Sequence, residues 1–274
     1  RYVRGAIKLS DLAQSESSLA DAKAKFIRAE NNLAVNEKDF ENIIGYLPNN
    51  IKEIDNLDLN LPTNLNETLN LALINNPELI IAKLNFQKSK YLLKGAAEKF
   101  APKASVSFEV SENEDVSSTI SEREQSQFEA KVEFPLYSGG KNYSFYKEKK
   151  ALFVSSELDY QDKKNETKKN ATNVWSEFLL KKSELDLAKA QLQAAEIAYE
   201  GIIQEYENGS RDTLDVLNSR SLLLIARLNF ADIERDEIVS RFKLLKVTGN
   251  LTSLYLKLET KQINPKTNWI RHIF

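Results

Sequence analysis

The sequence predicts a mainly α-helical protein that also carries one β-hairpin. The helices are very long, antiparallel and coiled-coil-like, and the hairpin consists of two amphipathic strands. Three observations support this fold class: long stretches without helix-breaking residues, a central region where apolar and polar residues alternate, and an internal duplication of a helical segment. The 274 residues are enough to bury a core in one or two domains.

Long helices are predicted where glycine and proline are absent over many residues. Residues 141–200 contain neither, and apolar side chains recur there at helical spacing. At 1.5 Å per residue this stretch forms a helix of roughly 90 Å, far longer than an ordinary globular helix. Similar stretches predict extended helices at residues 11–44 and 213–248. An ordinary solvated coiled coil explains the three helices equally well.

The central region changes to the period of two that is typical of β-strands. Residues 103–110 and 127–134 each set apolar side chains against polar or charged ones. Each run is close to the roughly 9 to 11 residues that a tilted strand needs to cross a bilayer, and its charged face suits a water-filled lumen. The polar segment 111–125 is predicted to be an outside loop. A soluble hairpin packed on a helix explains the strands about equally well, because two strands cannot close a barrel.

Composition argues against several classes of function. The 38 basic residues nearly balance the 40 acidic ones, so the net charge of -2 does not indicate a nucleic-acid partner. The chain has no cysteine, which excludes disulfides and thiolate metal sites. Its single histidine, His272, is interpreted as a surface residue. We therefore expect no catalytic residue, no metal site and no cofactor, and an enzyme is the least supported class.

An offset of 204 positions aligns residues 1–45 with residues 205–249 without a gap. Identical residues occupy both ends and the interior of this alignment, including the pairs Gly5 and Gly209, Asp11 and Asp215, and Gly45 and Gly249. Shared coiled-coil composition accounts for scattered serine, leucine and alanine matches, but less readily for the glycines and this aspartate. We interpret the pattern as an internal duplication.

Three short motifs occur in a specific order along the chain. They are residues 69–79 (LNLALINNPEL), residues 134–140 (FPLYSGG) and residues 206–217 (YENGSRDTLDVL). In this order they resemble the TolC family of outer-membrane channel proteins, in which the first is similar to a helix followed by an NNP-x-L element, the second to a strand-ending turn and the third to a helical turn. Each motif alone is weak, whereas the three in this order are specific. The resemblance extends from residue 1 to about residue 258 and has no counterpart for the last residues.

The resemblance implies an outer-membrane conduit for drug efflux or type I protein secretion in a Gram-negative bacterium, extending into the periplasm. It implies a homotrimer with a β-barrel in the outer-membrane lipid and an α-helical tunnel below it. A periplasmic adaptor (membrane fusion) protein and an inner-membrane pump are the implied partners, and the conduit itself is passive. Members of this family contain two repeats, so we expect the chain to start late in the first one. The alternative is a soluble structural coiled-coil protein with a β-hairpin and no pore.

The same resemblance divides the chain into five regions. Residues 1–45 are expected to form a periplasmic helical hairpin arm of repeat one, and residues 46–101 the equatorial segment and ascending helix of repeat two. Residues 102–137 are expected to form the outer-membrane β-hairpin, and residues 138–249 the long periplasmic helical hairpin of repeat two. Residues 250–274 are expected to form a C-terminal equatorial segment and tail.

The family's tunnel closes at its periplasmic helix tips, and the resemblance implies which residues form that gate here. Asp11 is expected to pair with Arg211, and Tyr206 to hydrogen-bond near Ser10 and Asp11. The adaptor is expected to contact the tips at Gly5 and Gly209. Where the family can carry two aspartates at the constriction, this chain has Asp215 and Asn218. A favourable charge in the first turn of a helix explains Asp215 equally well.

Overall fold

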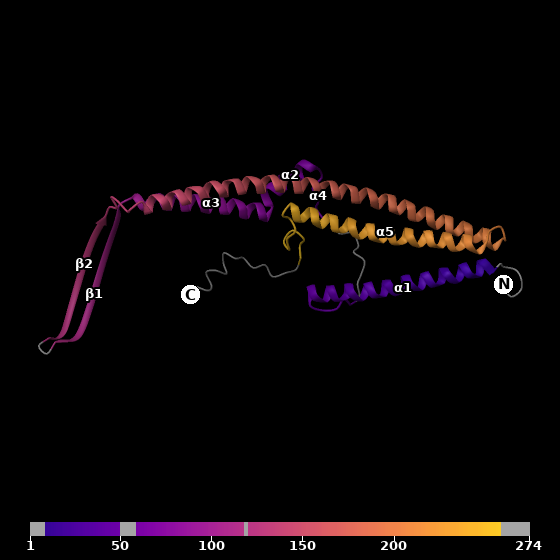
Figure 1. Ribbon diagram of the computed structural model, residues 1–274, viewed down its shortest axis with the longest axis horizontal. Helices are drawn as coiled ribbons and strands as arrows, with labels where there is room; N and C mark the ends of the chain where they lie inside the picture. The colour runs from indigo at the N-terminus through magenta and orange to yellow at the C-terminus, as the bar shows by residue number, and fades with distance from the viewer. Residues whose placement is uncertain (1–8, 50–58, 118–119, 259–274) are drawn as a thin grey trace. The chain divides into compact units, whose positions relative to one another are not determined.

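The structure is a computed structural model that describes residues 9–49, 59–117 and 120–258; for residues 10, 11, 113–117 and 120–123 it describes the backbone alone. The described chain forms six α-helical and 3-10 segments and two strands (Figure 1). It divides into two compact units. Of the described residues, one unit contains 9–49, 59–65, 173–246 and 251–258, and the other contains 66–117, 120–172 and 247–250.

Two shorter helices of the second unit meet at a single capping residue: α2 (Leu65–Asn75) and α3 (Pro77–Ala97). Asn76 Oδ1 accepts hydrogen bonds from the backbone nitrogens of Glu78 and Leu79, at 3.1 Å each. Pro77, which lacks a backbone N–H, occupies the first helical position, where none is needed. Asn76 Nδ2 also donates to the carbonyl oxygen of Val247 at 3.0 Å. Asn76 and Pro77 thus separate α2 from α3.

After α3, the short 3-10 segment η2 (Glu98–Phe100) leads into an antiparallel hairpin of β1 (Lys103–Ser117) and β2 (Ile120–Glu133). The strands are longer than predicted, and the prediction of a loop at residues 111–125 is wrong. Pairing continues through Ser111 opposite Gln125 and Asn113 opposite Arg123, with a register irregularity between Glu114 and Ser117. Backbone groups make the ladder, so polar side chains at these positions do not end it.

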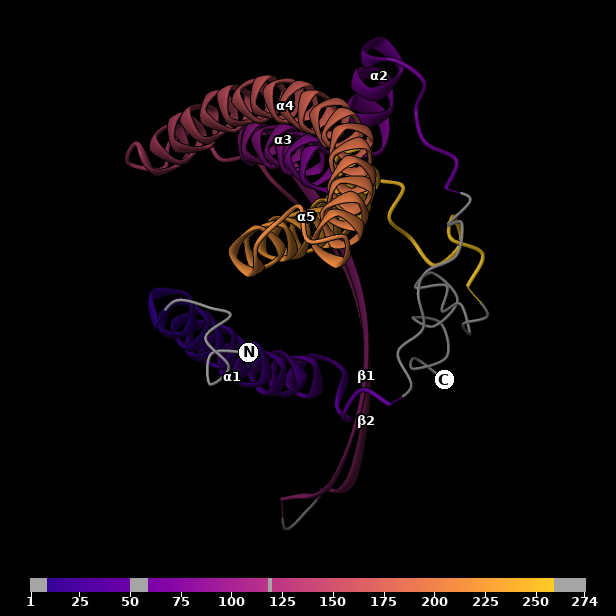
Figure 2. The ribbon, with the colours of Figure 1, turned by 90° about the vertical axis from the view of Figure 1, so that its right-hand side faces the viewer.

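The helix α4 (Lys141–Glu207) has 67 residues and begins after two glycines with positive φ. Gly139 has φ 62° and Gly140 has φ 79°, a conformation that glycine adopts without steric cost. In the second unit, α3 runs beside the first part of α4 (Figures 1 and 2). The ring of Phe86 lies 5.4 Å from that of Phe153 and stacks on Tyr160 at 6.0 Å. These contacts hold the two helices together by apolar and aromatic packing.

In the first unit, the later part of α4 pairs with α5 (Thr213–Val247) in the antiparallel sense (Figure 1). Small or apolar side chains are buried in α4 and α5, among them Ala188, Leu223 and Ala226. Polar side chains also join the two helices: Lys243 donates to Glu177 at 2.7 Å, Arg227 to Glu196 at 3.1 Å, and Asn229 to Gln191 at 3.3 Å. The later part of α4 and α5 thus form a long antiparallel helical pair.

The helix α1 (Leu9–Ile44) also belongs to the first unit and corresponds to α5 in the internal alignment. Its bounds agree with the helix predicted at residues 11–44. Its packing differs, because Leu19 is 56% exposed whereas the matching Leu223 is only 6% exposed. Within the described residues, no helix has both the length and the apolar character needed to span a membrane.

Candidate functional site

The turn between α4 and α5 is the described part of the predicted gate. Gly209 has φ 77°, and its backbone nitrogen donates to the carbonyl oxygen of Tyr206 at 3.0 Å. The nitrogen of Ser210 donates to the carbonyl oxygen of Glu205 at 2.8 Å. These two bonds form a Schellman motif, in which a left-handed glycine satisfies the last carbonyls of a helix. The motif ends α4 at this turn and gives the tip a defined backbone.

Arg211 connects the end of α4 to the start of α5 across this turn. Its Nε lies 2.7 Å from Oε2 of Glu205, and its Nη1 lies 3.6 Å from Oδ2 of Asp215. The hydrogen bond to Glu205, supported by the charges of Glu205 and Asp215, raises the pKa of Arg211. Arg211 is half-exposed, as are both carboxylates. A charged guanidinium at an accessible tip can exchange one carboxylate partner for another.

Asp215 lies at the start of α5, a position where aspartate is common in helices. Oδ1 of Asp212 accepts a hydrogen bond from the backbone nitrogen of Asp215 at 2.9 Å, so Asp212 is the N-cap. Asp215 lies in the first helical turn, where a negative charge is favourable. Asn218 follows on the next turn and is exposed. The helix-terminus explanation for Asp215 therefore applies, and it is compatible with a role at the constriction.

Sequence reasoning missed Glu205 and Asp212. The DTLD sequence at residues 212–215 has the spacing of a capping box, which was a usable signal for Asp212. No comparable signal identifies Glu205, because its partner Arg211 follows six residues later and meets it only after the chain has turned.

The structure describes the other predicted gate residues only in part. Gly5 lies outside the described residues. Ser10 and Asp11 are within α1, but their side chains are outside the described part, so the predicted pairing of Asp11 with Arg211 stays a prediction. Tyr206 is half-buried in the last turns of α4.

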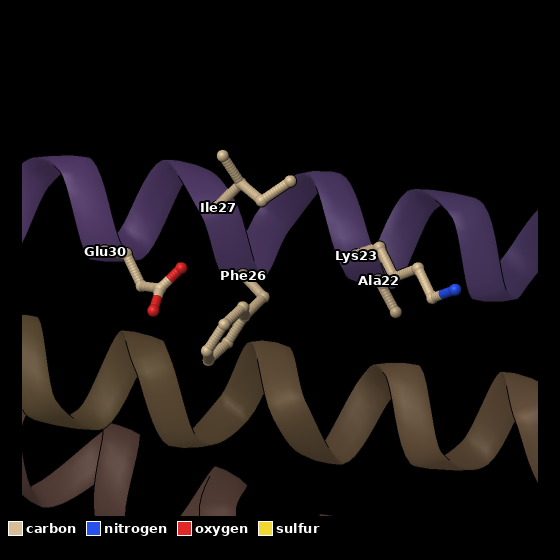
Figure 3. Close-up of a pocket in the computed structure, with 5 residues that line it drawn as sticks. All are labelled: Ala22, Lys23, Phe26, Ile27 and Glu30. Carbon is tan, nitrogen blue, oxygen red and sulfur yellow. The ribbon is translucent and has the colours of Figure 1, made fainter.

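A shallow hollow of about 440 Å³ lies along α1 (Figure 3). It is lined from this helix alone by Ala22, Lys23, Phe26, Ile27 and Glu30. Phe26 projects from the helix in Figure 3 and is 64% exposed. Ala22 is likewise exposed, whereas its counterpart Ala226 in α5 is buried. The hollow is thus an uncovered helix face.

The hairpin presents two chemically different faces. Residues directly opposite each other in an antiparallel pair project to the same side. Val106 is opposite Ala130 and Phe108 is opposite Phe128, so one face is apolar. Polar and charged pairs occupy the other face: Lys103 with Glu133, Ser105 with Lys131, and Ser107 with Glu129. Val106, Phe108 and Phe128 are each 69% exposed, so the apolar face is open within the chain.

A comparison with known families identifies the chain. The model of the family described as "Outer membrane efflux protein" matches residues 68–250, which contain the hairpin, α3, α4 and α5. The chain belongs to this family. Membership in the outer membrane efflux protein family confirms the resemblance to TolC-like channels and places the protein in the outer membrane. It is a family of channels and not one of enzymes.

Individual relatives of the outer membrane efflux protein family agree with this assignment. The outer membrane efflux protein BepC of Brucella suis biovar 1 (strain 1330) is 22% identical over 261 residues, covering 95% of this chain and 57% of BepC. The MtrE outer membrane channel of Neisseria gonorrhoeae, in its open state, has a TM-score of 0.74 at 16% identity, covering 92% of this chain and 59% of that one. The CmeC outer membrane channel of Campylobacter jejuni has a TM-score of 0.73 at 18% identity, covering 99% and 57%.

These structural similarities confirm the predicted fold class of long helices with a hairpin. The chain spans a little over half the length of the relatives that it matches. Among the described residues, no group of three or more His, Cys, Asp and Glu side chains is arranged to hold a metal ion.

Proposed function

We propose that this chain is part of a protomer of a homotrimeric outer-membrane conduit for efflux or type I secretion. In this proposal, the hairpin contributes to a β-barrel in the lipid, and the long helices continue the passage into the periplasm. Transport through the conduit is passive, with energy supplied by an inner-membrane pump that a periplasmic adaptor links to the helix tips. Membership in the outer membrane efflux protein family supports the part of this proposal that concerns efflux across the outer membrane.

The open apolar face of the hairpin is the observation that carries the proposal. An isolated two-stranded hairpin is marginally stable in water, and an uncovered apolar face makes it less so. In lipid, the same face is favourable, while the charged face suits an aqueous lumen. Neighbouring protomers would supply the strands that the edges of β1 and β2 need, because unpaired backbone groups are costly in a bilayer.

The gate is proposed at the helix tips, close to the turn at residues 208–212. Arg211 is a suitable component because it is charged, half-exposed and already paired with two carboxylates. In the closed state, Asp11 is proposed to pair with Arg211, and Tyr206 to hydrogen-bond near Ser10 and Asp11. Asp215 is proposed to give the constriction one carboxylate per protomer, with neutral Asn218 on the next turn. A ring with fewer carboxylates attracts cations less strongly.

Single-cysteine labelling tests the proposed membrane orientation of the hairpin, and the absence of native cysteine makes it direct. Val106→Cys and Phe128→Cys probe the apolar face, and Ser107→Cys and Glu129→Cys are the matched variants on the polar face. In outer membranes containing the protein, we expect a membrane-impermeant sulfonated maleimide to label the polar-face cysteines. The apolar-face cysteines should react only after the membrane is dissolved and the protein denatured.

Equal labelling of both faces in intact membranes would contradict a lipid-facing hairpin. That outcome would favour the soluble coiled-coil alternative for this part of the chain. Labelling of the polar face alone, combined with no ion conductance in a planar bilayer, would keep the membrane orientation and reject the conduit.

A further inference from the structure

Lysine and aromatic side chains gather where the helices of the second unit meet the hairpin. We define this collar as residues 91–103 and 137–150, which run from the end of α3 through η2 to the first residue of β1, and from the turn after β2 into the start of α4. The collar contains seven lysines and two glutamates, so it is strongly basic, although the whole chain has a net charge of -2. The positive charge is therefore concentrated at the junction between the helices and the hairpin. Such a concentration indicates an anionic partner.

Four of the seven collar lysines lie against aromatic rings. Lys99 Nζ is 4.1 Å from the centroid of the Phe145 ring, and Lys149 Nζ is 4.8 Å from the same centroid. Lys147 Nζ lies 4.8 Å from the ring centroid of Tyr143. Rings at these distances attract the ammonium groups and limit their motion. The rings also position these positive charges beside apolar surface.

The collar is held together across the two helices that form it. Asn142 Nδ2 donates a hydrogen bond to the carbonyl oxygen of Lys99 at 3.1 Å, although the two residues are 43 positions apart. The rings of Phe100 and Tyr146 meet edge to face at 6.3 Å. The basic groups are consequently presented by one packed junction, and the strands β1 and β2 leave from that same junction.

We propose that this collar binds the anionic headgroups of phospholipids in the leaflet that adjoins the helices. The inference rests on the proposed insertion of the hairpin, since insertion brings its base to the level of the lipid headgroups. Tyr91 is 69% exposed and Tyr143 is 56% exposed, and exposed tyrosines beside lysines are typical of the boundary between lipid and water. The exposed rings favour a lipid over an acidic protein as the partner. The headgroup phosphates meet the ammonium groups while the rings contact the upper acyl chains.

The test compares two charge-removing double variants in detergent micelles of the intact protein. Lys99→Gln with Lys147→Gln removes two exposed collar charges, and Lys168→Gln with Lys169→Gln removes two exposed charges elsewhere on α4. Affinity for dioleoylphosphatidylglycerol is measured by the shift in melting temperature as this lipid is titrated in, with dioleoylphosphatidylcholine as the neutral lipid. Each basic residue near an anionic lipid surface contributes about fivefold in affinity. We therefore expect the collar variant to lose roughly 30-fold and the control variant less than about twofold.

Three results would overturn the proposal. The wild type could respond equally to both lipids, the collar variant could keep the wild-type affinity, or the control variant could lose as much as the collar variant. An arm with inorganic phosphate separates a lipid site from a simple anion site, because full competition by millimolar phosphate would reject the lipid.

Conductance of the collar variant in a neutral phosphatidylcholine bilayer separates this proposal from the proposed function. A normal pore with weakened phosphatidylglycerol binding supports both proposals. A normal pore with unchanged lipid binding rejects only the lipid site. If the wild type also forms no pore in any bilayer, the conduit itself is rejected.

Discussion

At the tip turn, one arginine contacts carboxylates from both helices of the hairpin. Glu205 lies at the end of α4 and Asp215 at the start of α5, so Arg211 bridges the turn from within its own chain. This bridge has a consequence for the proposed gate. Any closure that recruits Arg211 to Asp11 has to compete with Glu205, and the gate is then an exchange between carboxylates of similar chemistry.

Single-channel conductance distinguishes the two roles of Arg211. In a planar bilayer, the double change Asp11→Ala and Arg211→Ala should raise the conductance of a closed channel, because it removes the proposed pair between hairpins. Glu205→Gln should leave the channel closed, since it removes only the contact within the tip. Unchanged conductance in the double variant would retain the pore but remove the proposed pair, and an equal rise in both variants would assign the effect to tip geometry.

A second residue-scale feature is the close packing of Gly249. Its φ is 72°, and a Cβ built there would lie 2.1 Å from the carbonyl oxygen of Asn75. The matching Gly45 also has a positive φ, but a Cβ there would meet nothing within 4 Å. The two copies of the duplicated segment thus place the same residue in different surroundings.

Substitution of the two glycines should separate strain from steric overlap. Gly249→Ala should lower the free energy of unfolding by roughly 3 kcal/mol or more, because backbone strain and a clash with backbone atoms add. Gly45→Ala carries the strain alone and should cost about 1 kcal/mol. Urea unfolding followed by circular dichroism measures both. Equal losses for the two variants would show that the contact with Asn75 does not matter.

At the scale of elements, the sequence predicted the helices well because their signal is local. The stretch without glycine and proline at residues 141–200 lies within α4, which continues to Glu207 and ends in the turn at Gly209. The helix break at Asn76 was likewise predictable from Pro77. Strand length was not, because the pairing beyond Val110 depends on backbone partners in the other strand and not on an apolar pattern.

The sequence also could not predict which side chains of different helices contact each other. Asp236 on α5 lies 3.3 Å from Lys181 on α4 and 2.8 Å from Arg235 beside it. Hydrogen bonds from Arg235 and then Lys181 lower the pKa of the Asp236 carboxyl. A carboxyl with a lowered folded-state pKa stabilises the fold above its unfolded pKa, and that contribution is lost as the pH falls through the folded value.

The pH dependence of unfolding tests the role of Asp236. Asp236→Asn should reduce stability at neutral pH and should reduce the loss of stability below about pH 4, where an unperturbed aspartate takes up its proton. Asn229→Ala is the control, because it removes a neutral hydrogen bond between the same two helices, to Gln191, and should lower stability by the same amount at every pH. Urea titrations at a series of pH values provide the measurement. Parallel profiles for Asp236→Asn and wild type would contradict a contribution from this contact.

At the scale of the whole molecule, the two duplicated helices, α1 and α5, differ in how far their matching residues are buried. α5 buries Leu223 and Ala226, whereas α1 exposes Leu19, Ala22 and Phe26. The sequence predicted two equivalent helices, and it could not predict that one would lack a cover in this chain, because burial depends on which segments pack together. The open face of α1 is the surface that the proposed assembly would have to cover.

Assembly should therefore be sensitive to charge on this face. Phe26→Glu places a carboxylate on the uncovered apolar surface and should reduce the fraction of trimer by at least half, since burying an unpaired charge is costly. Arg28→Glu introduces the same residue two positions away, on a different side of the helix, and should leave the trimer intact. Native gels and light scattering of detergent-solubilised protein report the trimer fraction. Loss of trimer in both variants, or in neither, would count against a specific role for the open face.

The strands β1 and β2 continue past their apolar residues, and this extra length would shape the outer end of the proposed conduit. β1 has 15 residues, about 50 Å of extended chain, while the apolar band of an outer-membrane barrel is about 25 Å tall. Even when tilted, hydrogen-bonded strands of that length would rise above the lipid as a stiff rim. An orifice framed by ladder backbone would keep a nearly constant width, so the proposed conduit would select its cargo at the opposite end.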